Sequence, residues 1–185
     1  MRIGLLADTH IPHEVLELPP QVKESFNDVD LILHGGDIYE LSLLDQLEEI
    51  APVLAARGNG DTKLPDDPRL KIAHLIIVGS LSLGLAHAVE YPELEWYPLE
   101  KSMQRFFGGR VDILICGDSH VPVAEECKGV VVINPGSPNL PWGLRQLGTV
   151  GLLQVDDGLL EVRIIDLGTG TDLSRLTKFF PETLT

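Results

Sequence analysis

The sequence predicts an α/β (α+β) fold in which two β-sheets pack face to face as a sandwich and helices flank it. In the first half of the chain, short apolar runs alternate with helix-like stretches, which is typical of parallel βαβ units. In the second half, strand-like runs predominate, and Asp156-Asp157-Gly158 is a strong hairpin signal. Together these strands are too many for one doubly wound sheet in a chain of 185 residues.

In the first half, each predicted strand is an apolar run that ends at a polar, glycine-containing segment. These runs are Arg2–Ala7, Leu31–His34 and Val53–Arg57. Two helices are expected between them, over Gln21–Asn27 and Glu40–Ile50. The second helix is the clearer one, because its leucines recur at helical spacing and therefore share one face.

The second half begins with two strand-like runs broken at Gly79, which predict a hairpin; they are Leu70–Val78 and Ser80–Ala86. A helix is expected over Leu99–Phe107, because Gly108 and Gly109 follow it as a stop signal. Four more runs predict buried strands and a final hairpin: Val111–Cys116, Val130–Ile133, Thr149–Val155 and Leu159–Leu167.

Composition and charge exclude several classes of protein. The length suits one domain over residues 1–185, and the formal net charge of −14 disfavours long nucleic-acid tracts. No apolar run reaches the roughly 18 residues of a membrane helix, so no membrane partner is expected. A signal peptide is not recognisable, and two cysteines make no disulfide framework, so the expected location is cytoplasmic.

Polar side chains gather where the predicted strands end. The ordered set reads D-x-H at 8–10, G-G-D at 35–37, G-N-x-D at 58–61, a strand-ending His87, G-x-S-H at 117–120 and N-P-G-S at 134–137. An extended backbone would point Asp8 and His10 in the same direction, towards one ion. Asp, His and Asn offer oxygen and nitrogen ligands without sulfur, which suits Mn²⁺, Zn²⁺ or Fe.

Each motif taken alone has an ordinary structural explanation. A D-x-H triplet is usually accidental, and an Asp after Gly-Gly is most often a turn residue. His34 and His74 are expected to be structural histidines, His13 a surface residue and Cys116 a buried apolar residue. The ordered set carries the functional interpretation, because six independent accidents in this order and context would be rare.

With these motifs, the chain resembles the calcineurin-like metallophosphoesterases, specifically the small YfcE-type phosphodiesterases. The resemblance implies two divalent metal ions: Mn²⁺ is favoured, with Zn²⁺, Fe, Ni²⁺ or Mg²⁺ as alternatives. It implies hydrolysis of a small phosphoester substrate by a hydroxide that bridges both metals. The implied metal ligands are Asp8, His10 and His120 for the first ion, Asp37 as the bridge, and Asn59, His87 and Asp118 for the second. The implied catalytic residues are Asp37, Asn59 and His87.

Two positions depart from the family pattern. Asp118 stands where the family usually has His, which lowers the positive charge of the loaded site and favours Mn²⁺ or Mg²⁺ over Zn²⁺. Gly60 stands where larger relatives have a His that protonates the leaving group, so the chain is expected to prefer acidic leaving groups such as aryl phosphodiesters. His13 or Asp61 could supply a proton instead.

Two other functions remain open. The segment His10-Ile11-Pro12-His13 is also similar to the small retromer subunit, a non-enzymatic protein-binding scaffold of the same family. A plain α/β binding domain is the more remote alternative. Substrate specificity is expected to come from Val89–Trp96 and Ser137–Leu147, whose Tyr91, Trp96, Trp142 and Arg145 could line a substrate wall or a homo-oligomer interface.

Overall fold

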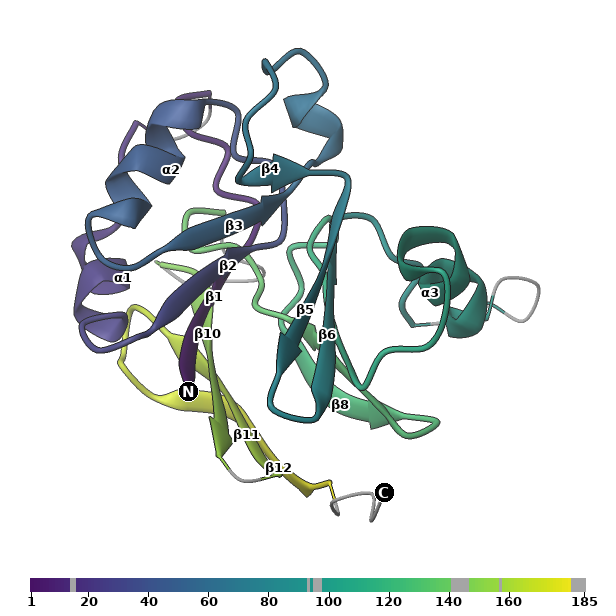
Figure 1. The fold of residues 1–185 in the computed structure, drawn as a ribbon. Coiled ribbons are helices and arrows are strands. Elements are labelled where there is room, and N and C mark those ends of the chain that lie inside the picture. The colour runs from purple at the N-terminus through teal and green to yellow at the C-terminus, as the bar shows by residue number, and fades with distance from the viewer. Residues whose placement is uncertain (14–15, 93, 95–97, 141–146, 157, 181–185) are drawn as a thin grey trace.

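Two β-sheets lie face to face at the centre of the protein in the computed structural model, as the sequence predicted (Figure 1). The structure describes residues 1–13, 16–92, 94, 98–140, 147–156 and 158–180. Helices α1 (Pro20–Ser25) and α2 (Leu41–Glu48) cover the outer face of one sheet, and α3 (Leu99–Phe107) covers the other. The layers are therefore helix, sheet, sheet and helix.

The larger sheet has seven strands in the order β12-β11-β10-β1-β2-β3-β4. Its parallel half consists of β1 (Arg2–Leu6), β2 (Leu31–His34), β3 (Val53–Ala56) and β4 (Leu70–Lys71). Its antiparallel half consists of β10 (Thr149–Asp156), β11 (Leu159–Asp166) and β12 (Asp172–Phe179). The predicted βαβ units and the final hairpin both belong to this sheet.

The smaller sheet has five strands in the order β5-β6-β7-β9-β8. They are β5 (Ala73–Val78), β6 (Leu81–Ala86), β7 (Ile113–Ile115), β8 (Val123–Cys127) and β9 (Val130–Asn134). Strands β6, β7 and β9 are parallel, whereas β5 and β8 pair antiparallel at the two edges.

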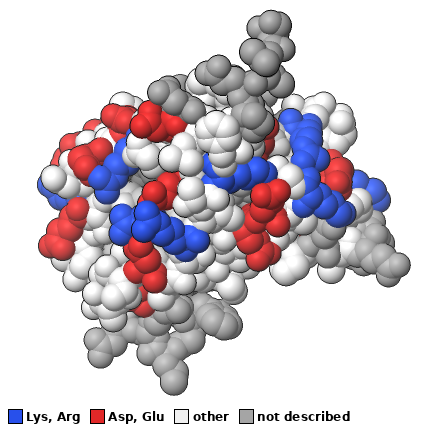
Figure 2. Space-filling model, turned by 90° about the horizontal axis from the view of Figure 1, so that it is seen from below, with Lys and Arg blue, Asp and Glu red and all other residues white. Residues whose placement is uncertain are grey.

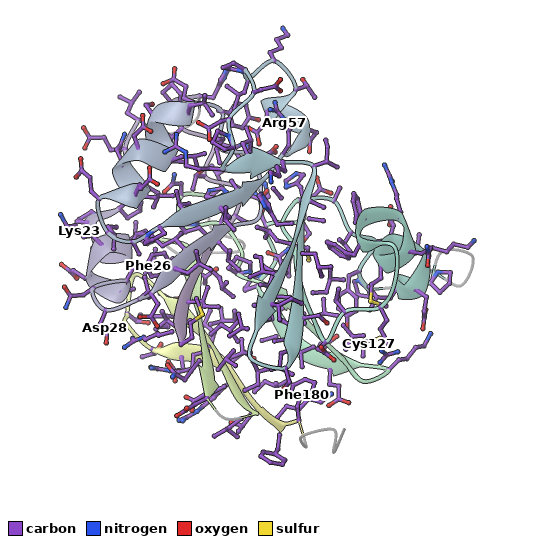
Figure 3. All side chains as sticks on the ribbon, viewed as in Figure 1. Lys23, Phe26, Asp28, Arg57, Cys127 and Phe180 are labelled. Carbon is purple, nitrogen blue, oxygen red and sulfur yellow. The ribbon has the colours of Figure 1, made fainter. Side chains whose placement is uncertain are left out.

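Among the described residues, three apolar clusters hold these layers together. The first lies between the seven-stranded sheet and α1 with α2; there Phe26, labelled in Figure 3, packs its ring 3.0 Å from where a Cβ on Gly4 would be. The second fills the space between the sheets and includes Leu5, Leu33 and Leu85. The third packs α3 on the five-stranded sheet and contains Cys116, which is buried as expected.

Three predicted details were wrong or missing. The run predicted as one strand over Leu70–Val78 is divided, because Leu70 and Lys71 pair with β3 in one sheet while Ala73–Val78 pair with β6 in the other. Strands β8 and β12 had not been predicted, because their exposed, charged side chains hide the apolar alternation of an edge strand.

Among the described helices, none is long and apolar enough to cross a membrane.

Candidate metal centre

Parallel strands from both sheets deliver the predicted site residues to one edge of the sandwich. Asp8, Asp37 and Asn59 follow β1, β2 and β3, while His87 and Asp118 follow β6 and β7. The carboxyl ends of parallel strands meet at the same edge of a sheet, and here the edges of two sheets coincide. Backbone hydrogen bonds join the loops: Asp8 N donates to Gly36 O at 2.9 Å, and Gly117 N donates to His87 O at 3.1 Å.

Asp8, His10 and His120 form the first group whose ligand atoms could hold an ion, all within 4.8 Å of one another. These are the residues predicted for the first metal, but the physical reason given for Asp8 and His10 was wrong. Strand β1 ends at Leu6, and both residues have left-handed backbones, with φ of 52° and 50°. Because left-handed φ is rare for non-glycine residues, the convergence depends on a strained loop and not on an extended strand.

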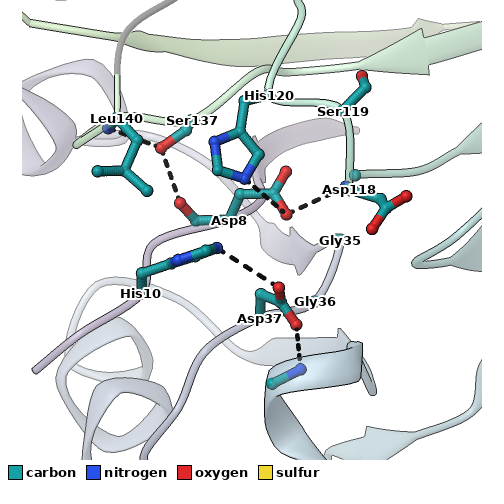
Figure 4. A network of polar contacts seen from close by, with 12 residues as sticks. Asp8, His10, Gly35, Gly36, Asp37, Asp118, Ser119, His120, Ser137 and Leu140 are labelled. Carbon is teal, nitrogen blue, oxygen red and sulfur yellow. Dashed lines mark hydrogen bonds and ion pairs between the residues drawn. The ribbon is translucent and has the colours of Figure 1, made fainter. Parts of the chain in front are cut away.

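The carboxylate of Asp8 lies at the centre of the cluster (Figure 4). Its Oδ1 accepts a hydrogen bond from the Asp118 backbone N–H at 3.0 Å, whereas none of the described residues donates to the buried Oδ2. Burial raises the pKa of this carboxyl to about 7, although His87 and the Asp118 N–H oppose the rise. A buried carboxylate oxygen without a donor is the arrangement that a cation would satisfy.

Asp8, Asp37 and His87 form a second such group that shares Asp8 with the first. Because His87 Nδ1 lies 2.7 Å from the Gly35 carbonyl oxygen, Nδ1 donates a hydrogen bond to it, and Nε2 faces the cluster. That Nε2 lies 3.0 Å from Asn59 Oδ1 and 3.6 Å from Asp37 Oδ1. When Nε2 carries no proton, these three atoms are all acceptors, and such a set fits a divalent cation.

Asp37 contacts residues of both groups. Its Oδ2 lies 3.4 Å from His10 Nε2, and its Oδ1 accepts from Gly60 N at 2.8 Å (Figure 4). Burial alone would raise the pKa of this carboxyl, but the contacts with His10, Gly60 N–H and His87 outweigh it and lower the pKa. Asp37 therefore contacts one histidine of each ligand group.

Asp118 belongs to neither buried group. Its side chain is 54% exposed, and its Oδ1 lies 3.5 Å from His87 Nε2. It lies on the rim of the cluster, beside His87 Nε2, which was predicted to bind the same ion. Its place as a ligand of the second metal stays a prediction.

Asp61 organises the turns beneath the cluster, a function that the sequence did not reveal. Its buried carboxylate accepts four backbone hydrogen bonds of 2.8–3.0 Å, from the N–H groups of Asp37, Ile38, Tyr39 and Gly58. All four lone-pair positions of the carboxylate are therefore occupied, so Asp61 has no capacity to serve as the proton donor considered above.

Two polar networks tie the D-x-H loop to its neighbours. His34 Nδ1 accepts from Gly36 N at 3.1 Å, its Nε2 lies 3.2 Å from Thr9 Oγ1, and Thr9 Oγ1 donates to Asp37 O at 3.3 Å. On the other side, Ser137 Oγ donates to Asp8 O at 2.7 Å. His34 and the N-P-G-S turn therefore have the structural roles expected for them.

The remaining predicted residues belong to neither ligand group or lie outside the described residues. His74 is buried and bonds the Ala55 carbonyl through Nε2 at 2.9 Å, while His13 is exposed, as expected. Tyr91 donates a hydrogen bond to Glu125. Trp96, Trp142 and Arg145 lie outside the described residues.

Tyr39 is a residue of this region that the motifs did not identify. Its ring centroid lies 4.7 Å from that of His10 and 5.1 Å from that of His13. Its backbone is also left-handed, with φ of 67°. A positive φ at a bulky residue beside a cluster of acids and histidines is a structural signal of function that the sequence does not carry.

Comparisons with known proteins agree with this geometry. A family model described as the calcineurin-like phosphoesterase superfamily domain matches residues 1–158. The chain is 36% identical over 171 residues to a probable metallophosphoesterase of Methanothermobacter thermautotrophicus, covering 91% of this chain and 94% of that protein. It is 29% identical over 166 residues to a phosphodiesterase of Methanocaldococcus jannaschii, covering 84% and 94%.

The fold is also similar to a solved structure of vacuolar protein sorting 29 from Cryptosporidium parvum. The TM-score is 0.76 at 21% identity, and the match covers 98% of both chains. At this level of identity the likeness concerns the fold alone.

Proposed function

Because the chain belongs to the calcineurin-like phosphoesterase superfamily, we propose that it is a phosphodiesterase that uses two divalent cations to hydrolyse a small phosphoester. The observation that carries the proposal is the pair of ligand groups that share Asp8, with Asp37 in contact with residues of both. Two overlapping sets of hard ligands suit two adjacent ions, which is the arrangement of many phosphate-processing sites.

For the residues that would hold the ions, we keep the division predicted from the sequence. Asp8, His10 and His120 would hold one ion, Asn59, His87 and Asp118 the other, and Asp37 both. When bound, the cations would neutralise phosphate charge and lower the pKa of a water molecule so that it can act as the nucleophile. We infer Mn²⁺ as the favoured metal, because ligands of oxygen and nitrogen without sulfur suit Mn²⁺, Zn²⁺ or Fe, and the carboxylate of Asp118 favours Mn²⁺ over Zn²⁺.

The protein's own groups would preorganise this chemistry. The Gly35 carbonyl holds His87 in the tautomer that faces the cluster, and the Gly60 N–H orients Asp37. Asn59 is exposed and neutral, so its amide could both ligate and orient a substrate phosphate. Polar groups that are already held in position need no reorganisation when the reaction occurs.

The test is a metal analysis combined with an assay of one substrate. Purified protein is analysed for bound Mn, Zn, Fe and Ni and then assayed with an aryl phosphodiester, with and without added Mn²⁺. Asp37→Asn should lose turnover and bound metal. Asp66→Asn is the matched control, because it removes the same charge from an exposed loop and should retain both.

Absence of metal and of turnover with every metal tested would overturn the proposal. That result would instead favour the protein-binding scaffold, which uses the same fold. Turnover that survives in Asp37→Asn would also contradict the assignment, because the residue in contact with both ligand groups would then be dispensable.

A further inference from the structure

The ring of Tyr39 lies beside two residues of the candidate metal centre. One is His10, which belongs to the first ligand group, at 4.7 Å between ring centroids. The other is Gly60, which follows the predicted ligand Asn59 and donates its N–H to Asp37. Tyr39 is half-buried, so part of its side chain faces solvent beside the cluster.

The absence of a side chain at Gly60 makes room for this ring. A Cβ on Gly60 would lie 2.7 Å from Cζ of Tyr39, 2.9 Å from Cε2 and 3.0 Å from the hydroxyl oxygen. Carbon atoms do not approach an aromatic ring so closely without displacing it. Tyr39 therefore occupies the space that any larger residue at position 60 would need.

The ring is also held in place. The Tyr39 backbone N–H donates to Asp61 Oδ1 at 2.9 Å while φ is 67°, so its left-handed conformation is fixed from below. His10 and His13 flank the ring, both tilted by nearly 50° to its plane. A side chain that is already ordered loses little conformational entropy when a ligand packs against it.

We propose that Tyr39 is a specificity-determining residue whose ring packs against the leaving group and favours aryl over alkyl esters. The inference rests on the proposed phosphodiesterase function, because the ring lies beside His10 and Gly60, next to the residues that would hold the phosphate. Aromatic groups in contact gain an attraction beyond the area they bury, which an alkyl group does not share. Selectivity for aryl leaving groups would then come from contact as well as from leaving-group acidity.

The experiment separates contact from acidity by using two substrates with leaving groups of similar acidity. These are p-chlorophenyl methyl phosphate and hexafluoroisopropyl methyl phosphate, assayed with the Mn²⁺-loaded protein. The quantity measured is the ratio of their kcat/KM values in the wild type, Tyr39→Phe and Tyr39→Leu. Phe and Leu meet the same left-handed backbone as Tyr, so backbone strain is matched between the variants.

Tyr39→Leu should lower the aryl-to-fluoroalkyl ratio of kcat/KM about 2- to 10-fold, which is the range expected for the loss of one aromatic contact. The change should arise mainly from a higher KM for the aryl ester. Tyr39→Phe should retain the wild-type ratio, because it keeps the ring. Gly60→Ala provides a second route that leaves Tyr39 intact: its Cβ displaces the ring and should lower the ratio in the same direction.

An unchanged ratio in both Tyr39→Leu and Gly60→Ala overturns the inference. An equal fall in Tyr39→Phe and Tyr39→Leu also overturns it, because the effect would then belong to the hydroxyl. Wild-type protein that turns over neither ester at any metal concentration refutes the proposed function itself, so the two failures are distinguishable.

Discussion

The imidazole of His34 should give the folding stability of this protein a pH dependence that follows from its contacts. The side chain is fully buried, and its Nδ1 accepts a hydrogen bond from the Gly36 N–H, so that nitrogen must stay unprotonated in the fold. Burial, reinforced by the charges of His87 and His10 and opposed by Asp37, lowers the pKa of His34 from 6.5 to about 3.

The sign follows from comparing the two states. Unfolded His34 binds a proton below its ordinary pKa of 6.5, whereas folded His34 stays neutral down to about pH 3. Between pH 6.5 and about 3, protons therefore favour the unfolded chain. The contribution of the neutral His34 side chain to folding stability is complete above pH 6.5 and decreases as the pH falls towards 3. At about 1.36 kcal/mol per pKa unit, the loss between pH 7.5 and pH 5 is about 2 kcal/mol.

Urea unfolding of metal-free protein at pH 7.5 and pH 5 measures this loss. Asp8 titrates over the same range with the opposite sign, because burial raises its pKa to about 7, so the wild type alone is not informative. The comparison is with His34→Asn, whose side-chain oxygen can still accept from Gly36. Its loss of unfolding free energy between the two pH values should be smaller than that of the wild type by about 2 kcal/mol.

Equal losses in the wild type and His34→Asn would refute the reasoning. Thr9→Val provides the control for the network itself, because it removes the hydroxyl beside Nε2 but keeps the imidazole. It should lower stability at both pH values and retain the wild-type pH dependence.

Three further predictions concern the loops around the ligands. Gly36→Ala should destabilise by more than about 1 kcal/mol in urea unfolding and reduce bound metal, because φ is 104° and a Cβ would lie 2.5 Å from His87 Nδ1. Ser137→Ala should cost about 1 kcal/mol in the same assay, since the hydrogen bond to Asp8 O is lost. Asp118→His should shift metal content towards Zn²⁺ and strengthen inhibition by inorganic phosphate, because it removes one negative charge; unchanged inhibition would contradict the charge argument.

The order of the motifs indicated which side chains gather at the candidate metal centre, but not the geometry that brings them together. Asp8, Asp37 and His87 each follow a strand that an apolar run identifies, so their common edge follows from parallel strand topology. The left-handed φ at Asp8 and Asp37 cannot be predicted in this way. Neither residue is a glycine, and such a conformation persists only because hydrogen bonds from other loops fix it.

The roles of Asp61 and Tyr39 also could not be predicted from the sequence. Asp61 looked like a candidate acid, yet its carboxylate is fully used by backbone donors that come from two separate turns. No sequence motif pointed to Tyr39. Its ring packs where a side chain at Gly60 would otherwise lie, and this contact is visible only in the structure. Local patterns identify candidate ligands, whereas residues whose position depends on long-range packing become visible only in the structure.

The acidic composition acquires a more specific meaning at this site. The chain carries a formal charge of −14, and Lys and Arg lie among Asp and Glu on the face in Figure 2. In the proposed loaded site, two divalent ions would outweigh the carboxylates of Asp8, Asp37 and Asp118 by one positive charge.

A small phosphoester would respond mainly to this local charge, because surface charges farther away than about 8–10 Å are screened at physiological salt. A long polyanion would also have to lie along the acidic surface, where repulsion accumulates with each phosphate. The charge therefore restricts the size of the substrate and leaves its phosphate chemistry unrestricted.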